Sequence, residues 1–501
     1  MVRRNIVANF LGSAWQTLVS LIFIPFYIRI LGIEAWGLIG FFFTLQGVLS
    51  LLDLGLSATL TRETARLSAL KGREDEMRDL VRTLEIVYWG VAIFVAFGVL
   101  ILSQYISHNW VRPGQLSLLS IEQSCVMMGF IIALQMPAGF YSGGLMGLQE
   151  QVLVNIINGV MAILRSGGAL LVLWLVSPTI QAYFVWQVVV GIFSVSFLGY
   201  FLWRRLPKTL NRATFRMKIL SGVWRFTAGM SGVSILTVIL TQIDKVILSK
   251  MLSLEAFGYY TLATMVSMSL AKLFTPVFYS IYPKFTQLVA ISDMPELIRI
   301  YHKSCQFISV LILPVAAILV LFSYEVMLFW THSNATAAQT YLLVSILVCG
   351  SALNGLMNPP YALQLAFGWT RLSVIKNIVA VVLVVPGIIL MADRYGATGA
   401  AFAWLLLNLG YLVFEIPVMH FKLLRTEKWH WYIVDVGGPF FVSLVVAGLG
   451  RLLLNQTGTT VFVGFYLAAI FLLTAIGVVM AAPSIRGEAY KYLSRVKLIY
   501  G

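Results

Sequence analysis

Ionisable side chains inside long apolar segments are the residues of this sequence that could do the most chemistry. Arg165 and Lys272 each lie near the middle of an apolar run long enough to cross the roughly 30 Å hydrocarbon core of a bilayer. A charge at mid-bilayer costs about 2.5 to 3.5 kcal/mol on insertion scales, so such residues usually face a bundle interior or a wet cavity. Each therefore lines a cavity that binds a substrate or forms a structural pair with an acid.

Five further ionisable residues are candidates for binding a substrate. Asp53, the acid within Leu-Leu-Asp-Leu-Gly-Leu, has a substrate role or anchors helix ends by hydrogen bonds. Asp244 and Lys245 are adjacent, and neighbours in sequence do not face each other on a helix, so at least one of them needs a partner elsewhere. Arg29 and Lys376 lie nearer the ends of their segments, where a long side chain can also reach the headgroups.

The balance of these embedded charges is cationic. A wet cavity with fixed positive charge attracts an anion by electrostatics alone, so the predicted ligand is anionic. The embedded cations are Arg29, Arg165, Lys245, Lys272 and Lys376, and the embedded acids are Asp53, Asp244 and Glu325.

Composition places these candidates in a helical membrane protein. The residues are 59% hydrophobic and 11% charged, whereas soluble domains have about 25% charged residues. Apolar runs of about 20 residues recur along the chain, and the alternating pattern of barrel strands is not seen. The net charge of +15 comes mainly from bases in loops between spans, which is the positive-inside signal of membrane insertion and argues against a nucleic-acid partner.

A duplicated architecture is predicted from a repeated link between spans. The heptapeptide Leu31–Gly37 recurs at Leu252–Gly258, and Pro137 and Asn155 recur at nearly the same offset as Pro359 and Asn377. We predict an all-α polytopic protein with 14 transmembrane helices, in which two pseudo-symmetric six-helix lobes precede two C-terminal helices. The seventh predicted span is 224–249, and the eleventh and twelfth are 372–392 and 397–420. Both termini are predicted on the cytoplasmic side. The predicted divisions are an N-lobe at 1–203, a cytoplasmic amphipathic linker at 204–223, a C-lobe at 224–421, and spans thirteen and fourteen with a C-terminal tail at 422–501.

Motifs for catalysis, ATP hydrolysis and metal binding are not found in the sequence. The three cysteines lie in apolar runs and are interpreted as small buried hydrophobes, and the five histidines and several tryptophans are interpreted as interfacial. We therefore predict no enzyme activity, catalytic residue, metal or cofactor. The residues are Cys125, Cys305 and Cys349; His108, His302, His332, His420 and His430; and Trp36, Trp110, Trp330 and Trp429.

Dispersed motifs along nearly the whole chain resemble the polysaccharide flippases of the MATE-like exporter superfamily, typified by Wzx-type O-antigen flippases. The motifs are Pro25-Phe-Tyr-Ile-Arg-Ile-Leu-Gly32, Glu34-Ala-Trp-Gly37, Asp53-Leu-Gly-Leu56, Thr61-Arg-Glu-Thr-Ala65, Asp244-Lys-Val-Ile-Leu248, Glu255-Ala-Phe-Gly-Tyr-Tyr260, Ile281-Tyr-Pro-Lys-Phe285 and Tyr395-Gly-Ala-Thr-Gly-Ala-Ala401.

The resemblance implies two lobes that open alternately to the cytoplasm and to the outside, in the inner (plasma) membrane. It implies an oligosaccharide on undecaprenyl diphosphate as cargo, as in O-antigen, capsule or exopolysaccharide synthesis, with coupling to H⁺ or Na⁺ and a polysaccharide polymerase or export machinery as possible partners. The cationic interior agrees with a diphosphate. Asp244 and Lys245 match a recurrent family pattern, so packing and substrate roles both stay open. The alternative functions are an ion-coupled multidrug or organic cation exporter of the same superfamily and a multi-span glycan polymerase or ligase.

Overall fold

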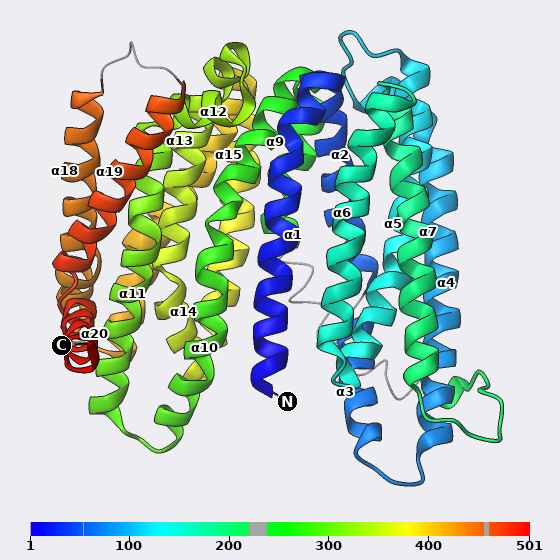
Figure 1. Cartoon of the computed structure of the whole chain (residues 1–501), viewed down its shortest axis with the longest axis horizontal. Coiled ribbons are helices and arrows are strands. Elements are labelled where there is room, and N and C mark those ends of the chain that lie inside the picture. The colour runs from blue at the N-terminus through cyan, green and yellow to red at the C-terminus, as the bar shows by residue number, and fades with distance from the viewer. Residues whose placement is uncertain (1, 54, 220–237, 455–459, 501) are drawn as a thin grey trace. The chain divides into compact units, whose positions relative to one another are not determined.

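The computed structural model describes residues 2–53, 55–219, 238–454 and 460–500 (Figure 1). Over these ranges the regular structure is helical, and twelve helices are long and apolar enough to cross a membrane. The prediction of an all-α membrane protein is confirmed to that extent. The predicted count of 14 spans is not confirmed. The seventh predicted span, 224–249, lies partly outside the described residues, and the predicted spans 372–392 and 397–420 fall within one long helical segment, Thr370–Leu423.

The chain forms two compact units, Met1–Gly258 and Tyr259–Gly501. Unit 1 ends within α9 (Leu254–Ser269), about 35 residues beyond the predicted linker at 204–223. Its helices are α1 (Val2–Leu31), α2 (Ile33–Leu49), η1 (Ser50–Asp53), α3 (Leu56–Ser68), α4 (Glu74–Tyr105), η2 (Ile106–Trp110), α5 (Leu118–Gly147), α6 (Gln151–Leu175) and α7 (Ile180–Arg205), and residues 238–251 are also helical.

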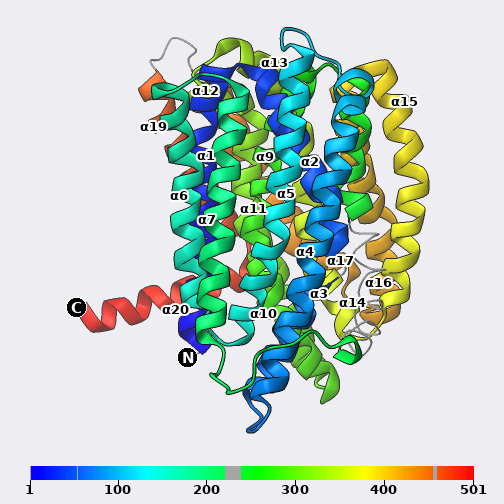
Figure 2. The same cartoon turned by 90° about the vertical axis from the view of Figure 1, so that its right-hand side faces the viewer.

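Unit 2 contains the remaining helices, which run largely alongside one another except for the last. Figure 2 shows the last helix, α20 (Pro483–Tyr500), lying across the direction of the long helices of its unit. The others are α10 (Ala271–Ala290), α11 (Met294–Leu321), α12 (Ser323–Thr331), α13 (Asn334–Leu356), α14 (Asn358–Ala366), α15 (Thr370–Gly410), η3 (Tyr411–Glu415), α16 (Ile416–Leu423), α17 (Lys428–His430), η4 (Trp431–Gly437), α18 (Gly438–Leu453) and α19 (Thr460–Ala481).

The repeated links pack against each other in unit 1. A Cβ on Gly37 would lie 2.0 Å from the carbonyl oxygen of Leu254, and a Cβ on Gly258 would lie 2.4 Å from that of Ile33. The contact is reciprocal, since each glycine meets the backbone at the start of the other repeat. Only residues without a side chain allow backbones this close, which gives a physical reason for glycine at the same place in both copies.

The acid of the first link has a local structural role. The carboxylate of Glu34 accepts hydrogen bonds from the backbone N–H groups of Gly114, Gln115 and Leu116, at 2.6, 2.8 and 3.3 Å. It therefore satisfies three donors of the segment that leads into α5. The link positions the crossing of α2 and α9 and fixes a neighbouring loop.

Helix α15 is interrupted at Gly396, in the gap between the predicted spans at 372–392 and 397–420. An unbroken helix of its 41 residues would be about 62 Å long, twice the thickness of the hydrocarbon core. Gly396 adopts φ 58° and ψ −141°, a conformation that side chains with a Cβ rarely adopt. A Cβ on Gly399 would lie only 2.0 Å from the carbonyl oxygen of Met391, so this second glycine permits close packing at the break.

The predicted amphipathic linker was expected to form a helix from Arg204 to Lys218. This prediction is wrong, because the chain is irregular from Leu206 to Arg216. The reason lies in α4, whose side chains take the backbone donors that a helix would use. The N–H of Thr214 donates to Asp79 Oδ1 at 2.7 Å, and the N–H of Arg216 donates to Thr83 Oγ1 at 3.0 Å. The predicted linker residues 220–223 lie outside the described residues.

The interfacial interpretation of the histidines and tryptophans is wrong at three positions. His302 and His420 are buried in unit 2, where His420 accepts or donates a hydrogen bond with the hydroxyl of Tyr301 at 3.0 Å. Trp36 is buried in unit 1, within the first link. The error arises because position near the end of a span does not reveal which side of the helix faces the protein. The cysteines are free thiols, and Cys125 and Cys305 are buried as predicted.

Candidate functional site

Arg165 is a half-buried cation on α6, which packs between α1 and α7. The hydroxyl of Tyr27 on α1 donates to the carbonyl of Ser166 at 2.6 Å, and its ring lies 5.4 Å from that of Tyr183 on α7. Gln187 on α7 donates to the carbonyl of Arg165 at 3.3 Å. These contacts fix α6 at the level of Arg165. Among the described residues, no acid is within ion-pair distance of its guanidinium.

Lys272 and Arg29 also have no acid within ion-pair distance in the part of the chain that the structure describes. Lys272 is exposed in the first turn of α10, and Arg29 is exposed in the last turn of α1. Together with Arg165, they are the predicted cations whose charge is not compensated by a neighbouring carboxylate in these ranges. An anionic ligand is the chemical species that could supply this compensation.

Lys376 is compensated within unit 2. Its ammonium donates to both carboxylate oxygens of Glu415, at 2.7 and 2.8 Å, and lies 4.8 Å from the ring centre of Tyr411 and 5.2 Å from that of Tyr361. Gln364 donates a further hydrogen bond to Glu415 at 3.0 Å. Glu415 is nearly fully buried, so this ion pair links α15 to η3 in the interior of the unit.

Asp244 and Lys245 form an ion pair with each other, and Lys245 also has a partner elsewhere on its helix. The ammonium of Lys245 lies 3.2 Å from Asp244 Oδ1 and also donates to the carbonyl of Thr241 at 2.8 Å. The long lysine stem bends back along the helix, and this lets it reach both the preceding side chain and the preceding turn. Sequence neighbours can therefore pair when one of them is long and flexible.

Asp53 is held by two hydroxyl groups. Ser57 on α3 donates to Asp53 Oδ1 at 2.6 Å, and Tyr88 on α4 donates to the same oxygen. Gly55, with φ 77°, provides the turn from η1 into α3 that brings Ser57 to the carboxylate. This arrangement matches the anchoring role considered for Asp53, and it ties α3 and α4 to the end of η1.

The chain matches a family model described as polysaccharide biosynthesis protein over residues 2–289, which is more than half of its 501 residues. The chain belongs to the polysaccharide biosynthesis protein family. With its many apolar helices, this family member is a multi-pass membrane protein.

One relative and several solved structures are similar to this chain. A protein of Shigella flexneri described as "Putative O-antigen transporter" is 23% identical over 402 residues, which cover 80% of this chain and 93% of the relative. The fold is similar to that of the lipid II flippase MurJ in an inward closed conformation, with 12% identity, a TM-score of 0.68 and coverage of 94% and 97% of the two chains. An inward-facing MATE family multidrug transporter has 14% identity, a TM-score of 0.65 and coverage of 81% and 96%.

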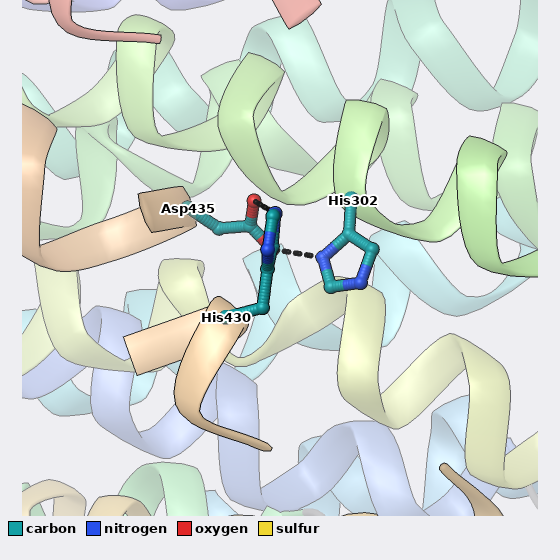
Figure 3. Close-up of side chains that lie close together, drawn as sticks. All are labelled: His302, His430 and Asp435. Atoms are coloured by element: carbon teal, nitrogen blue, oxygen red, sulfur yellow. Dashed lines mark hydrogen bonds and ion pairs between the residues drawn. The ribbon is translucent and has the colours of Figure 1, made fainter. Parts of the chain in front are cut away.

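In this family member, sequence reasoning missed the cluster of His302, Glu427, His430 and Asp435, which we call the imidazole–carboxylate cluster (Figure 3). His302 on α11 lies 2.5 Å from Asp435 on η4 and 3.1 Å from Glu427. Hydrogen bonds from the Thr426 hydroxyl and from His302 lower the pKa of Glu427 and favour its ionised form. The one sequence signal was Asp435 itself, an acid inside an apolar segment.

Glu85 is a second missed acid, buried on α4 in unit 1. It accepts hydrogen bonds from the Tyr141 hydroxyl at 2.7 Å and from Trp203 Nε1 at 3.0 Å, and it pairs with Arg82 at 2.8 Å. These partners come from α5 and α7, so Glu85 holds three helices together. Its satisfied surroundings indicate a structural role.

Proposed function

We propose that this chain is a flippase that moves an oligosaccharide linked to undecaprenyl diphosphate across the plasma membrane. The observation that carries the proposal is the presence of Arg29, Arg165 and Lys272 in apolar segments with no acid within ion-pair distance among the described residues. A membrane protein that keeps such cations loses insertion free energy unless they face water or a ligand. Family membership and the O-antigen transporter relative support the glycan class.

A diphosphate has the chemistry that these residues would bind. Its oxygens accept charge-assisted hydrogen bonds, which are short and about twice as strong as neutral ones, and an arginine can offer two parallel donors. Arg165 is the best-placed candidate, because hydrogen bonds from α1 and α7 fix its helix. In this proposal the sugar and diphosphate occupy a wet cavity while the polyprenyl tail stays in the lipid.

Transport proceeds by alternating access in this proposal, and the crossing of the two links is the outer gate. The reciprocal contact of Gly37 with Leu254 and of Gly258 with Ile33 closes the predicted outer end at α2 and α9. Opening to the outside requires these backbones to separate. The remaining proposed features are cytoplasmic termini, coupling to H⁺ or Na⁺, cooperation with a polymerase, and the absence of enzyme activity.

The proposal is tested in a bacterial strain in which this chain is deleted and then restored. Wild-type protein restores the surface glycan, whereas Arg165→Ala and Lys272→Ala each reduce it about tenfold or more, the effect of losing a hydrogen bond to a charged group. Immunoblots of membranes check that the variants are inserted. Arg299→Ala removes an exposed arginine paired with Glu296 and serves as the matched control. Normal surface glycan in both cavity variants would exclude the assigned sites.

The second candidate is an ion-coupled exporter of organic cations, which the likeness to the MATE transporter favours. Such an exporter needs unpaired acids in its cavity, but Asp53, Glu325 and Glu415 all have hydrogen-bond or ion-pair partners. Resistance of expressing cells to cationic dyes separates the two functions. Raised resistance without any effect on surface glycan would favour the exporter.

A further inference from the structure

We propose that the imidazole–carboxylate cluster is a binding site for a divalent transition-metal ion of the zinc type. The ligands would be His302 Nδ1, His430 Nε2 and a carboxylate oxygen of Asp435. These atoms already lie within 4.8 Å of one another in unit 2. Figure 3 shows the two rings and the carboxylate converging from α11 on one side and from α17 and η4 on the other.

The local winding of the chain brings His430 and Asp435 together. They are five residues apart, a spacing that does not share a face in an α-helix but does in a π-helix, which η4 is. His430 Nε2 lies 3.7 Å from Asp435 Oδ1, and the rings of His302 and His430 are 4.3 Å apart at their centroids. Short π-helices are frequent at functional sites, and here one carries Asp435 and begins directly after His430.

The buried carboxylate of Asp435 needs a positive partner. Asp435 is fully buried, while His302 is nearly buried and His430 is half exposed. Each ring nitrogen of His302 faces a carboxylate oxygen, Nδ1 that of Asp435 and Nε2 that of Glu427. One metal ion would compensate the charge of the buried Asp435 carboxylate and accept a neutral ring from each histidine.

The partners that a metal site requires beyond its ligands are present. Glu427 Oε2 lies 3.1 Å from His302 Nε2, which is the carboxylate–histidine–metal arrangement that fixes the ring and its tautomer. Gln306 Nε2 donates to Asp435 Oδ1 at 2.8 Å, and Ser309 donates to the backbone carbonyl of Asp435 at 2.7 Å. Residues of α11 thus hold both the carboxylate and the backbone of the aspartate.

The donor set selects the class of metal. Two imidazole nitrogens and one carboxylate suit Zn²⁺ or a neighbouring first-row ion, whereas Mg²⁺ and Ca²⁺ prefer oxygen ligands only. At metal–ligand distances of about 2.0–2.1 Å, tetrahedral ligands are about 3.3 Å apart. Binding would therefore widen the 2.5 Å contact of His302 with Asp435, replace its bridging proton, and draw in the exposed ring of His430. Water can take the fourth position on the exposed side.

A metal at this site would join α11 to the segment that leads into α18. Asp435 and His430 precede α18, and His302 lies in the first part of α11. The ion would tie these helices together at their predicted cytoplasmic ends, independently of any substrate. The seven candidate cavity residues are not part of the site.

The test is Zn²⁺ binding by the full-length chain in detergent, with any affinity tag removed and the protein first treated with a chelator. Elemental analysis after dialysis against ZnCl₂ should give one Zn²⁺ per chain, and Co²⁺ should give the absorption bands of a tetrahedral site. His430→Gln, at a half-exposed position, should lower the affinity at least tenfold, and Glu427→Gln should lower it about 10- to 100-fold. His332→Asn, at an exposed histidine with positive φ, should bind as wild type.

Thermal unfolding provides a second readout that does not depend on any one variant. Excess Zn²⁺ should raise the unfolding temperature of the wild type and of His332→Asn, because a ligand that binds only the folded state stabilises it. It should not raise that of His430→Gln to the same extent. Absence of a saturable Zn²⁺ or Co²⁺ site in the wild type, or equal binding by His430→Gln, would overturn the proposal and leave a proton-mediated network at this position.

Discussion

Arg165 and Lys376 show that cations in apolar segments of one protein can have different surroundings. Both are cations in apolar segments, but Lys376 has Glu415 at 2.7 Å, whereas Arg165 has no acid within ion-pair distance among the described residues. The positions of the two residues within their apolar segments could not distinguish a paired cation from an unpaired one. The partner of Lys376 is 39 residues away and reaches it only through helix packing. The predicted cationic excess is therefore carried by fewer residues than the sequence indicated.

Substitutions in the Lys376–Glu415 pair test whether Lys376 has a structural role or binds the substrate. Lys376→Ala leaves the buried carboxylate of Glu415 without its cation and should destabilise the protein by about 3 to 5 kcal/mol. The double exchange Lys376→Glu with Glu415→Lys should recover a large part of that loss, as measured by thermal unfolding in detergent. If Lys376→Ala abolished transport at unchanged stability, Lys376 would be a substrate residue instead.

Because Tyr88 donates a hydrogen bond to Asp53, substitution of either residue should lower the stability of the protein through the same interaction. Asp53→Asn keeps the shape but loses the charge that accepts from Ser57 and Tyr88, and Tyr88→Phe removes one donor. Each substitution should cost about 1 to 3 kcal/mol. In a double-mutant cycle read by thermal unfolding, the two losses should not add. Additive losses would show that the two groups do not act together.

At the scale of elements, the break in α15 depends on one glycine. Gly396→Ala forces a side chain into a positive-φ conformation that is essentially confined to glycine, which costs about 1 to 3 kcal/mol, and should lower the unfolding temperature. Gly410 lies in the same helix with nothing within 4 Å of its Cβ position, so Gly410→Ala is the matched control and should be neutral or slightly stabilising. Equal unfolding temperatures for both variants would contradict the strain at Gly396.

Element type and class followed from the sequence, whereas contacts between distant elements did not. Apolar runs predicted the helices, and the glycines of Tyr395–Ala401 lie at the break that separates two predicted spans. The linker was mistaken for a helix because its periodicity does not record that Asp79 and Thr83 accept its backbone donors. The imidazole–carboxylate cluster was missed because it joins residues 133 positions apart through a π-helix.

At the scale of the whole molecule, the close contacts of Gly37 with Leu254 and of Gly258 with Ile33 lead to a prediction about access from the outside. Gly37→Ala and Gly258→Ala each place a methyl group against a backbone oxygen. The overlap should cost about 1 to 3 kcal/mol and move the two links apart. A cysteine at the buried Leu38, in a chain whose native cysteines are replaced, should then react faster with an external, membrane-impermeant maleimide.

The matched control for the crossing is Gly98→Ala, because a Cβ on Gly98 meets nothing within 4 Å. This variant should label at the wild-type rate and transport normally. Unchanged labelling in both Gly37→Ala and Gly258→Ala would mean that the crossing is not a gate.

Translocation by the purified chain tests the proposed flippase most directly. Liposomes are prepared with a fluorescent oligosaccharide on undecaprenyl diphosphate in both leaflets, and an impermeant reagent destroys the exposed label. In empty liposomes about half of the label should survive in the inner leaflet. With wild-type protein nearly all of the label should become exposed and be lost, and with Arg165→Ala protection should persist. Protection that is equal with and without the wild-type chain, in the presence of a H⁺ or Na⁺ gradient, would contradict the proposed function.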